Sequence, residues 1–247
     1  MRFDLLTLFP DMCASYLNES IIGRAQEKGI LDINIYDIRE FTKDKHKRVD
    51  DYAYGGGMGM VMQVEPIYNC IKSLENEINA KPYVIYMSPK GRIFNQKVAK
   101  ELLKFPEIAV LCGHYEGIDQ RVIDLCVDDE ISIGDFVLTG GELPALALID
   151  CVSRMIPGVL SGEECYEDES IYSGLLEYPH YTRPASFMGI DVPEVLLSGH
   201  DKNIKHFRRA EALRITAERR PDLLYKAELT PDDIKILKEI WLKKEGD

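Results

Sequence analysis

The chain has few of the features that mark membrane, secreted or metal-binding proteins. Its N-terminal apolar run, residues 3–9, is interrupted by Asp4 and ends at Pro10, so it is too short for a signal peptide or a membrane span. The six cysteines are scattered and form no C-x-x-C pair, which disfavours a disulfide framework and a zinc site. We therefore expect a cytoplasmic protein with reduced thiols, no bound metal and no membrane partner.

The signals of the common nucleotide-binding folds are also missing. No G-x-G-x-x-G follows the first strand-like run, and no G-x-x-x-x-G-K-[ST] occurs anywhere in the 247 residues. Both motifs place glycines where the backbone must approach a phosphate group. Rossmann and P-loop folds are therefore disfavoured.

The charge of the chain gives two opposite indications. A net charge of −12 does not favour a nucleic-acid partner, because phosphate binding requires a cationic surface. However, residues 201–220 contain seven Lys and Arg against three acidic residues, and a second basic group occupies residues 43–48. From charge alone, a solvated helix face and an RNA-binding face are equally good interpretations of both segments.

The pattern of apolar residues predicts an α/β fold. Strand-like runs at 3–9, 31–36, 83–87, 108–112 and 130–133 alternate with helical segments at 11–28, 64–79, 95–105 and 118–125. Such alternation is typical of a parallel sheet that helices cover on both faces. A largely buried helix then begins at Glu142 and stops at Pro157 and Gly158.

The composition changes after residue 160. Residues 161–170, SGEECYEDES, contain five carboxylates and no apolar periodicity, which predicts a flexible acidic linker. Beyond it we expect helices at 203–219 and 230–244, with Thr230 and Asp233 in a capping arrangement. The predicted organisation is a domain over 1–160, a linker over 161–170 and a small, mainly helical domain over 171–247.

Three loops directly follow apolar strand-like runs: Ser88 to Arg92, Gly113 to Gly117, and Gly134 to Gly141. In open α/β sheets, ligands bind outside the carboxyl ends of the strands. One glycine after a strand is commonly only a turn residue. Three such junctions in succession favour one shared pocket.

Several uncommon residue strings occur in a fixed order along nearly the whole chain. They are Leu8-Phe9-Pro10, Val49-Asp50-Asp51, Tyr54 to Gly57, Ser88-Pro89, Gly113 to Asp119, Ser132 to Asp135, Thr139 to Pro144, Ser153-Arg154, Gly174 to Leu176, Pro179 to Pro184 and Pro193 to Gly199. In these strings the chain closely resembles the bacterial tRNA (guanine-N1)-methyltransferases of the SPOUT class, which modify the guanine 3′ of the anticodon.

The resemblance implies a more specific fold and a cofactor. It implies a parallel sheet whose C-terminal part forms a trefoil knot, followed by the small helical domain, which would bind tRNA. S-adenosylmethionine would bind in the knot. Carried over by matching motif, the cofactor-binding residues are Tyr86, Met87, Ser88, Pro89, Gly113, Tyr115, Glu116, Gly117, Ile133, Gly134, Asp135, Phe136, Val137, Leu138, Gly140, Gly141 and Pro144.

Methylation of guanine N1 requires removal of the N1 proton and stabilisation of the charge that develops toward O6. The resemblance implies that Arg154 stabilises this charge and that an acidic residue just before Ser170 is the base. Here that segment reads Asp168-Glu169-Ser170, whereas the family has an aspartate directly before the serine. Spacing to the downstream motifs favours Glu169 slightly, and a one-residue bulge would favour Asp168.

The resemblance also implies a homodimer with shared active sites and a dependence on magnesium, with Glu116 as a point of influence. The basic residues Lys205, Arg208 and Arg209 are the candidates for phosphate contact. Two alternatives stay open. A ribose 2′-O-methyltransferase of the same fold class is disfavoured by the acidic linker, and a catalytically silent RNA-binding module is disfavoured by Arg154 together with the linker carboxylates.

Overall fold

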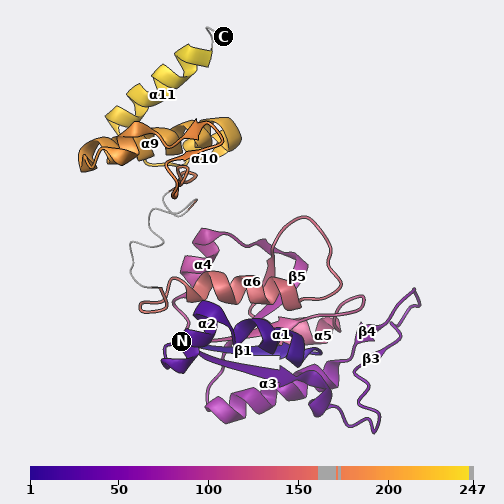
Figure 1. The fold of residues 1–247 in the computed structure, drawn as a ribbon. Helices are drawn as coiled ribbons and strands as arrows, with labels where there is room; N and C mark the ends of the chain where they lie inside the picture. The colour runs from indigo at the N-terminus through magenta and orange to yellow at the C-terminus, as the bar shows by residue number, and fades with distance from the viewer. Residues whose placement is uncertain (161–170, 172–173, 245–247) are drawn as a thin grey trace. The chain divides into compact units, whose positions relative to one another are not determined.

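A computed structural model describes residues 1–160, 171 and 174–244 of the chain. The chain divides into two compact units, Met1–Gly162 and Glu163–Asp247 (Figure 1). The linker predicted at 161–170, including both candidate base residues, lies outside the described residues. Within the described part, no helix is both long enough and apolar enough to span a membrane.

The first unit is built on a five-stranded sheet in the order β2-β1-β6-β5-β7. All four strand pairs are parallel, which confirms the α/β class and the parallel sheet predicted from the sequence. The strands are β1 (Arg2–Thr7), β2 (Asp32–Asp37), β5 (Tyr83–Ile93), β6 (Glu107–Cys112) and β7 (Asp129–Ser132).

Helices cover both faces of this sheet. In Figure 1, α4 and α6 lie on one side of it and α3 on the other. The helices of the unit are α1 (Pro10–Leu17), α2 (Ser20–Glu27), α3 (Val64–Ile78), α4 (Gln96–Leu102), α5 (Gln120–Cys126) and α6 (Glu142–Ser153), with the 3₁₀ helix η1 (Ile38–Phe41) and a short hairpin of β3 (Asp50–Asp51) and β4 (Val61–Met62).

The core of the first unit follows from alternation along the strands. Leu6, Val84 and Leu111 belong to one buried cluster with residues of α3 and α5, among them Ile71 and Val122. Successive strand residues point to opposite faces of a sheet, so neighbouring residues such as Leu5 and Val110, also fully buried, face the other helical layer. Apolar runs such as Ile108 to Cys112 in β6 are what a sheet covered on both faces requires of its central strands.

Two local predictions were wrong. The helix expected over 11–28 is broken at Asn18, and Asp11 does not cap it, since α1 begins at Pro10 with Phe9 as the N-cap. The loop expected after residue 87 is instead part of β5, which continues to Ile93 with a register shift between Met87 and Arg92 against β7.

Close packing of β5 on β7 explains a glycine in that extension. A Cβ added at Gly91 would lie 2.3 Å from the carbonyl carbon of Glu130, closer than two such atoms can approach. The strand continues where the sequence predicts a turn because its partner β7, about 40 residues later in the chain, supplies hydrogen bonds that a local pattern does not reveal.

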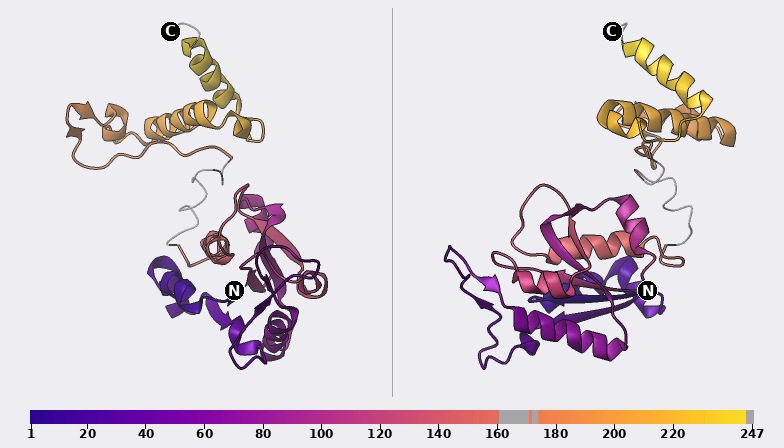
Figure 2. Two further views of the ribbon diagram at one scale, coloured as in Figure 1. Left: turned by 90° about the vertical axis from the view of Figure 1, so that its right-hand side faces the viewer. Right: turned by 180° about the vertical axis from the view of Figure 1, so that it is seen from behind.

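The second unit is mainly helical in its described part. It contains α8 (Glu194–Leu197), α9 (Asp201–Arg219), α10 (Pro221–Leu224) and α11 (Pro231–Lys244), with a hairpin of β8 (Ser186–Phe187) and β9 (Ile190–Asp191). Figure 2 shows α9 and α11 from two further sides. Its small core contains Leu175, Ala212, Leu213 and Leu237.

The start of α11 is held by one carboxylate. Thr230 N–H donates to Asp233 Oδ2 at 2.9 Å, and Asp233 N–H donates to Thr230 Oγ1 at 3.2 Å, which confirms the predicted capping arrangement. Asp233 also accepts two hydrogen bonds from Arg209 of α9, at 2.9 and 2.8 Å. Arg209 and Thr230 together lower the pKa of Asp233 to about 2. One buried carboxylate thus joins the two longest helices of the unit.

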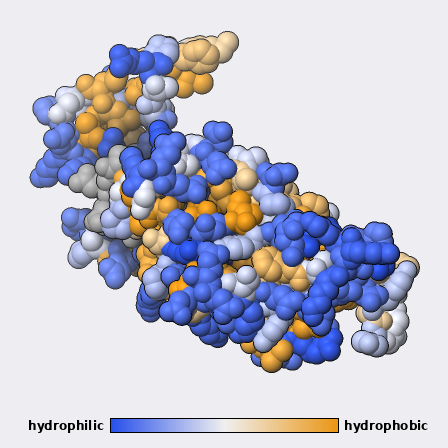
Figure 3. Space-filling model, turned by 90° about the horizontal axis from the view of Figure 1, so that it is seen from below, coloured by the Kyte–Doolittle hydropathy of each residue, from blue (hydrophilic) through white to orange (hydrophobic). Residues whose placement is uncertain are grey.

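The surface is mostly hydrophilic on the face that Figure 3 shows, with apolar patches among the polar side chains. Exposed apolar residues occur in both units, among them Tyr54, Val137, Met188 and Tyr225. Single exposed apolar residues are ordinary in soluble proteins, whereas grouped ones mark binding surfaces.

We predict that Asp233→Asn destabilises the chain by about 1–2 kcal/mol at neutral pH. Because the pKa of Asp233 is lowered in the folded state, this stabilisation is complete above the ordinary carboxyl range, about pH 4, and is lost as the pH falls toward 2. Denaturant unfolding followed by the fluorescence of Trp241, the single tryptophan, measures it on α11 itself.

The neighbouring residue supplies a matched control. Asp232 pairs with Lys235 at 2.9 Å, but its side chain is 82% exposed, so Asp232→Asn should change the stability little. Equal losses for the two variants at pH 7, or a loss at Asp233 that does not shrink in acid, would contradict the role assigned to Asp233.

Candidate functional site

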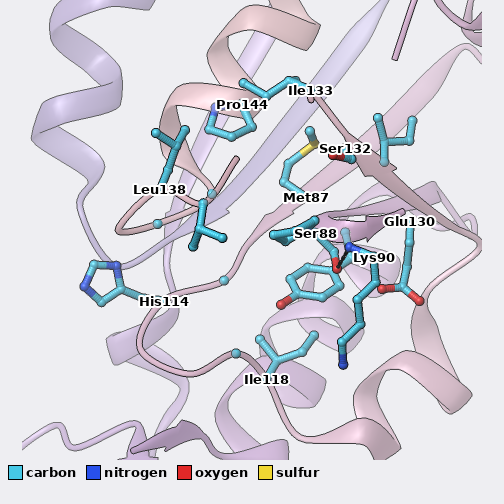
Figure 4. Close-up of a pocket in the computed structure, with 18 of the residues that line it drawn as sticks. Met87, Ser88, Lys90, His114, Ile118, Glu130, Ser132, Ile133, Leu138 and Pro144 are labelled. Carbon is cyan, nitrogen blue, oxygen red and sulfur yellow. Dashed lines mark hydrogen bonds between the residues drawn. The ribbon is translucent and has the colours of Figure 1, made fainter. Parts of the chain in front are cut away.

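The first unit contains a cavity of about 310 Å³ beside the middle of β5 and at the carboxyl ends of β6 and β7 (Figure 4). It is lined by residues 86–90 within β5 and by the loops that follow β6 and β7, so the three segments share one pocket. Of the residues predicted to bind a cofactor, only the exposed Asp135 is absent from the lining. The predicted residues that line it are Tyr86, Met87, Ser88, Pro89, Gly113, Tyr115, Glu116, Gly117, Ile133, Gly134, Phe136, Val137, Leu138, Gly140, Gly141 and Pro144.

Backbone hydrogen bonds hold the loops of the cavity together. Gly141 N–H donates to the Gly113 carbonyl at 2.8 Å, and His114 pairs with Gly140 in an isolated antiparallel bridge. On the other side, Glu116 N–H donates to the Met60 carbonyl at 3.0 Å. The loop after β6 is therefore fixed between the loop after β7 and the segment that leads into β4.

Two of the lining glycines are required by close packing. A Cβ on Gly113 would lie 2.8 Å from the ring of Tyr86, and a Cβ on Gly141 would lie 2.9 Å from the Cα of Cys112. Gly117 has a φ of +125°, which strongly favours glycine. The glycines of these loops thus let two chain segments meet at the wall of the cavity.

The cavity has an apolar end and a polar end. Figure 4 shows Leu138 and Pro144 on one side of it and Lys90 and Glu130 on the other. Ile133 joins the apolar group. A slot of this kind suits a flat, apolar group, while the carboxylate and the ammonium can bind polar parts of the same ligand.

Two polar atoms in the lining are buried without a hydrogen-bond partner among the described residues. They are Oε2 of Glu130 and Nδ1 of His114. A buried polar atom without a partner costs free energy, and at the wall of a cavity such atoms are natural contacts for a ligand. Burial, together with the charge of Glu130, raises the pKa of Tyr86 to about 12, so its hydroxyl stays protonated at neutral pH.

Sequence reasoning missed several residues of the lining. His114 lies within GHYEG and Lys90 within SPKGR. Both segments were predicted to form the pocket, so their positions in the sequence could have identified these two residues. Glu130 was treated as part of a strand, and only the structure shows its side chain at the cavity. The missed residues are Lys90, His114, Ile118, Gln120, Ile123, Glu130, Ile131, Ser132 and Thr139.

The residues predicted to be catalytic are not brought together in the described part of the chain. Arg154 is the C-cap of α6, where a cation interacts favourably with the helix dipole, and it is not among the residues that line the cavity. Asp168 and Glu169 lie outside the described residues.

The structure assigns different environments to the three predicted RNA-binding residues. Arg209 is bound to Asp233, so this cation has a structural role that charge counting did not predict. Arg208 is exposed, with its guanidinium 4.9 Å from the centre of the Tyr178 ring, and Lys205 is exposed three residues before it on α9. In the parts of the chain that can be described, no group of three or more His, Cys, Asp or Glu side chains could hold a metal ion.

Comparisons with known proteins agree on one family. Residues 1–226 match the family described as "tRNA (Guanine-1)-methyltransferase TrmD". A tRNA (guanine-N(1)-)-methyltransferase from Clostridioides difficile is 58% identical over 228 residues, covering 92% of this chain and 99% of the relative. One from Alkaliphilus metalliredigens is 52% identical over 247 residues, covering 99% of this chain and 100% of the relative.

The fold agrees with that of a solved structure. The crystal structure of the tRNA (m1G37) methyltransferase from Aquifex aeolicus superposes with a TM-score of 0.75 at 43% sequence identity, covering 92% of this chain and 95% of the other. Sequence and fold give the same answer over nearly the full length of the chain. This chain belongs to the TrmD family of tRNA (guanine-1)-methyltransferases.

Proposed function

We propose that this chain methylates N1 of the guanine at position 37, directly 3′ of the anticodon of tRNA, with S-adenosylmethionine as the methyl donor. The family membership supports the reaction, and the observation that carries it to this chain is the cavity, which all but one of the cofactor residues implied by the family line together. The test is transfer of a labelled methyl group to a tRNA transcript with guanine at position 37. A transcript with adenine there serves as the control.

The residues of the cavity fit this cofactor. When bound, S-adenosylmethionine supplies an electrophilic methyl group on a sulfonium. Ile133, Leu138 and Pro144 form an apolar slot for the adenine ring. Backbone N–H and C=O groups of the glycine loops can form hydrogen bonds with the edge of that ring. The carboxylates of Glu116 and Glu130 line the cavity and favour a ligand with a sulfonium and an ammonium group.

We propose that the cofactor loops belong to a trefoil knot. The strand β7 lies at the edge of the sheet beside β5, and the chain then returns so that Gly141 bonds to Gly113 in the loop after β6. This return brings the start of α6 against a loop formed earlier in the chain, and a knot requires such a return. Knotted chains are rare, and the family resemblance is what favours one here.

The chain's own residues would carry the proton and the charge of the reaction. Glu169, or Asp168 if the register differs by one residue, removes the N1 proton of guanine. Arg154 stabilises the negative charge that then spreads toward O6. Methyl transfer is an in-line displacement, so the remaining task of the protein is orientation.

The two units have separate roles in this proposal. The first unit, the predicted domain over 1–160, holds the cofactor, and the second, over 171–247, binds tRNA through Lys205 and Arg208. The active enzyme is a homodimer in which Arg154 and the base come from opposite chains. The magnesium dependence implied by the family stays a prediction, tested by assaying methyl transfer with and without a chelator.

We expect Leu138→Ala to weaken S-adenosylmethionine binding about tenfold, because it removes apolar contact from the cavity wall. Leu125→Ala is the matched control, since Leu125 is an exposed leucine of α5 that does not line the cavity. Isothermal calorimetry measures both affinities. Equal affinities for the two variants would mean that the adenine slot is placed wrongly.

The identity of the base can be decided by two isosteric changes. Asp168→Asn and Glu169→Gln each remove one carboxylate, and the variant that lacks the true base should lose methyl transfer by roughly a hundredfold or more while it keeps cofactor affinity. We expect this loss for Glu169→Gln. A loss confined to Asp168→Asn would reverse the assignment, and full activity in both variants would remove these carboxylates from the mechanism.

A mixing experiment tests the shared site. Arg154→Ala and Glu169→Gln should each be inactive as homodimers. If the two residues act from opposite chains, a heterodimer has one intact site, so random mixing should restore about a quarter of the activity. Mixtures that stay inactive although native mass spectrometry shows heterodimers would place both residues in one chain.

A further inference from the structure

The second unit contains a cavity of its own, of about 390 Å³. The segment from Tyr178 to Arg183 forms one wall, and Ile204 and Arg208, one turn apart on α9, form another. Of its lining residues, the function proposed above uses only Arg208, as a phosphate contact. Its lining combines aromatic rings with cationic groups.

The aromatic residues of this cavity are arranged with Arg208. The rings of Tyr178 and His180 lie 4.9 Å apart between centroids, and the Arg208 guanidinium lies 4.9 Å from the centroid of Tyr178. His180 Nε2 is 2.8 Å from Glu177 Oε1, which orients the imidazole ring. Tyr181 also lines the cavity and is 47% exposed, so its ring is accessible to a ligand.

Most of the α9 cations that form no ion pair among the described residues lie in the first half of the helix, which borders this cavity. Further along α9, Arg214 is neutralised by Glu211 and Glu218. Arg209 is neutralised by Asp233. By contrast, no ion pair of the described residues involves Arg183 or the α9 cations Lys202, Lys205, Arg208 and Arg219. Of these four α9 cations, all but Arg219 lie in the first half of the helix.

We propose that this cavity receives one unpaired nucleotide of the RNA substrate, with its base against Tyr181 and His180 and its phosphate on Arg208 and Arg183. The proposal rests on the proposed function, because it takes tRNA as the ligand. Unpaired bases stack on aromatic side chains, and the planar guanidinium group matches the geometry of phosphate. The cations at the rim favour RNA over an apolar peptide segment, which would leave them without counter-charge.

The test asks whether the effects of removing one side chain and one base on tRNA binding depend on each other. In a set of tRNA transcripts, each unpaired position of the anticodon arm carries an abasic site in turn. We expect one abasic tRNA to bind wild-type protein about tenfold more weakly than intact tRNA, as the loss of one stacked base predicts. Tyr181→Leu, which removes the aromatic ring, should weaken binding of intact tRNA by a similar factor and show no further loss with that abasic tRNA.

Control variants separate this from general surface effects. Tyr225→Leu removes a ring that is 92% exposed and lies outside the cavity. For this variant, each abasic site should weaken tRNA binding by the same factor as it does for wild-type protein. Arg208→Gln should reduce the log–log salt slope of tRNA binding by about one, whereas Lys226→Gln, an exposed cation elsewhere in the unit, should leave it unchanged.

Two results would overturn the proposal. One is that every abasic site weakens tRNA binding by the same factor in Tyr181→Leu as in wild-type protein, because the ring then contacts no unpaired base. The other is that Tyr181→Leu changes the sedimentation of the protein without RNA, because the cavity is then covered by protein. Methyl transfer to tRNA by wild-type protein is measured alongside. If transfer is absent, the proposed function is wrong. If transfer is normal but no abasic site depends on Tyr181, only the nucleotide-binding proposal is wrong.

Discussion

The cavity of the first unit depends on one backbone junction, the hydrogen bond from Gly141 N–H to the Gly113 carbonyl. At this point the loops after β6 and β7 approach so closely that a Cβ on Gly141 would clash with Cys112. Only glycine permits this approach. The junction joins the ends of two strands into the continuous wall of one cavity. Polar groups such as Glu130 line the same cavity.

The same junction reaches further into the unit through α6. Gly141 is the N-cap of α6, and the first residue of this helix, Glu142, is buried and accepts a hydrogen bond from Thr7 of β1 at 2.8 Å. The helix contributes Pro144 to the cavity and ends at Arg154. One helix therefore connects the loops of the cavity with the arginine proposed to stabilise the transition state.

Sequence reasoning succeeded where the local pattern alone determines the structure. The central strands β5 and β6 carry apolar runs because both faces of the sheet are covered, and glycine-bearing segments follow these runs, so the sheet and the shared pocket were both predictable. It failed where the decisive partner lies far away in the chain. The extension of β5 depends on β7, and the orientation of Glu130 into the cavity depends on how those two strands pair.

The charge of the second unit shows the same limit. A count of Lys and Arg over residues 201–220 does not reveal that Asp233, 24 residues beyond Arg209, neutralises that arginine. The structure thus divides the cations of α9: Arg209 and Arg214 are in ion pairs, whereas Lys202, Lys205, Arg208 and Arg219 take part in none among the described residues. For an acidic chain that binds RNA, this distribution is physically sensible, because screening limits each charge to about 10 Å at moderate salt. A few cations beside aromatic rings can then hold RNA locally, although the chain as a whole carries a net charge of −12.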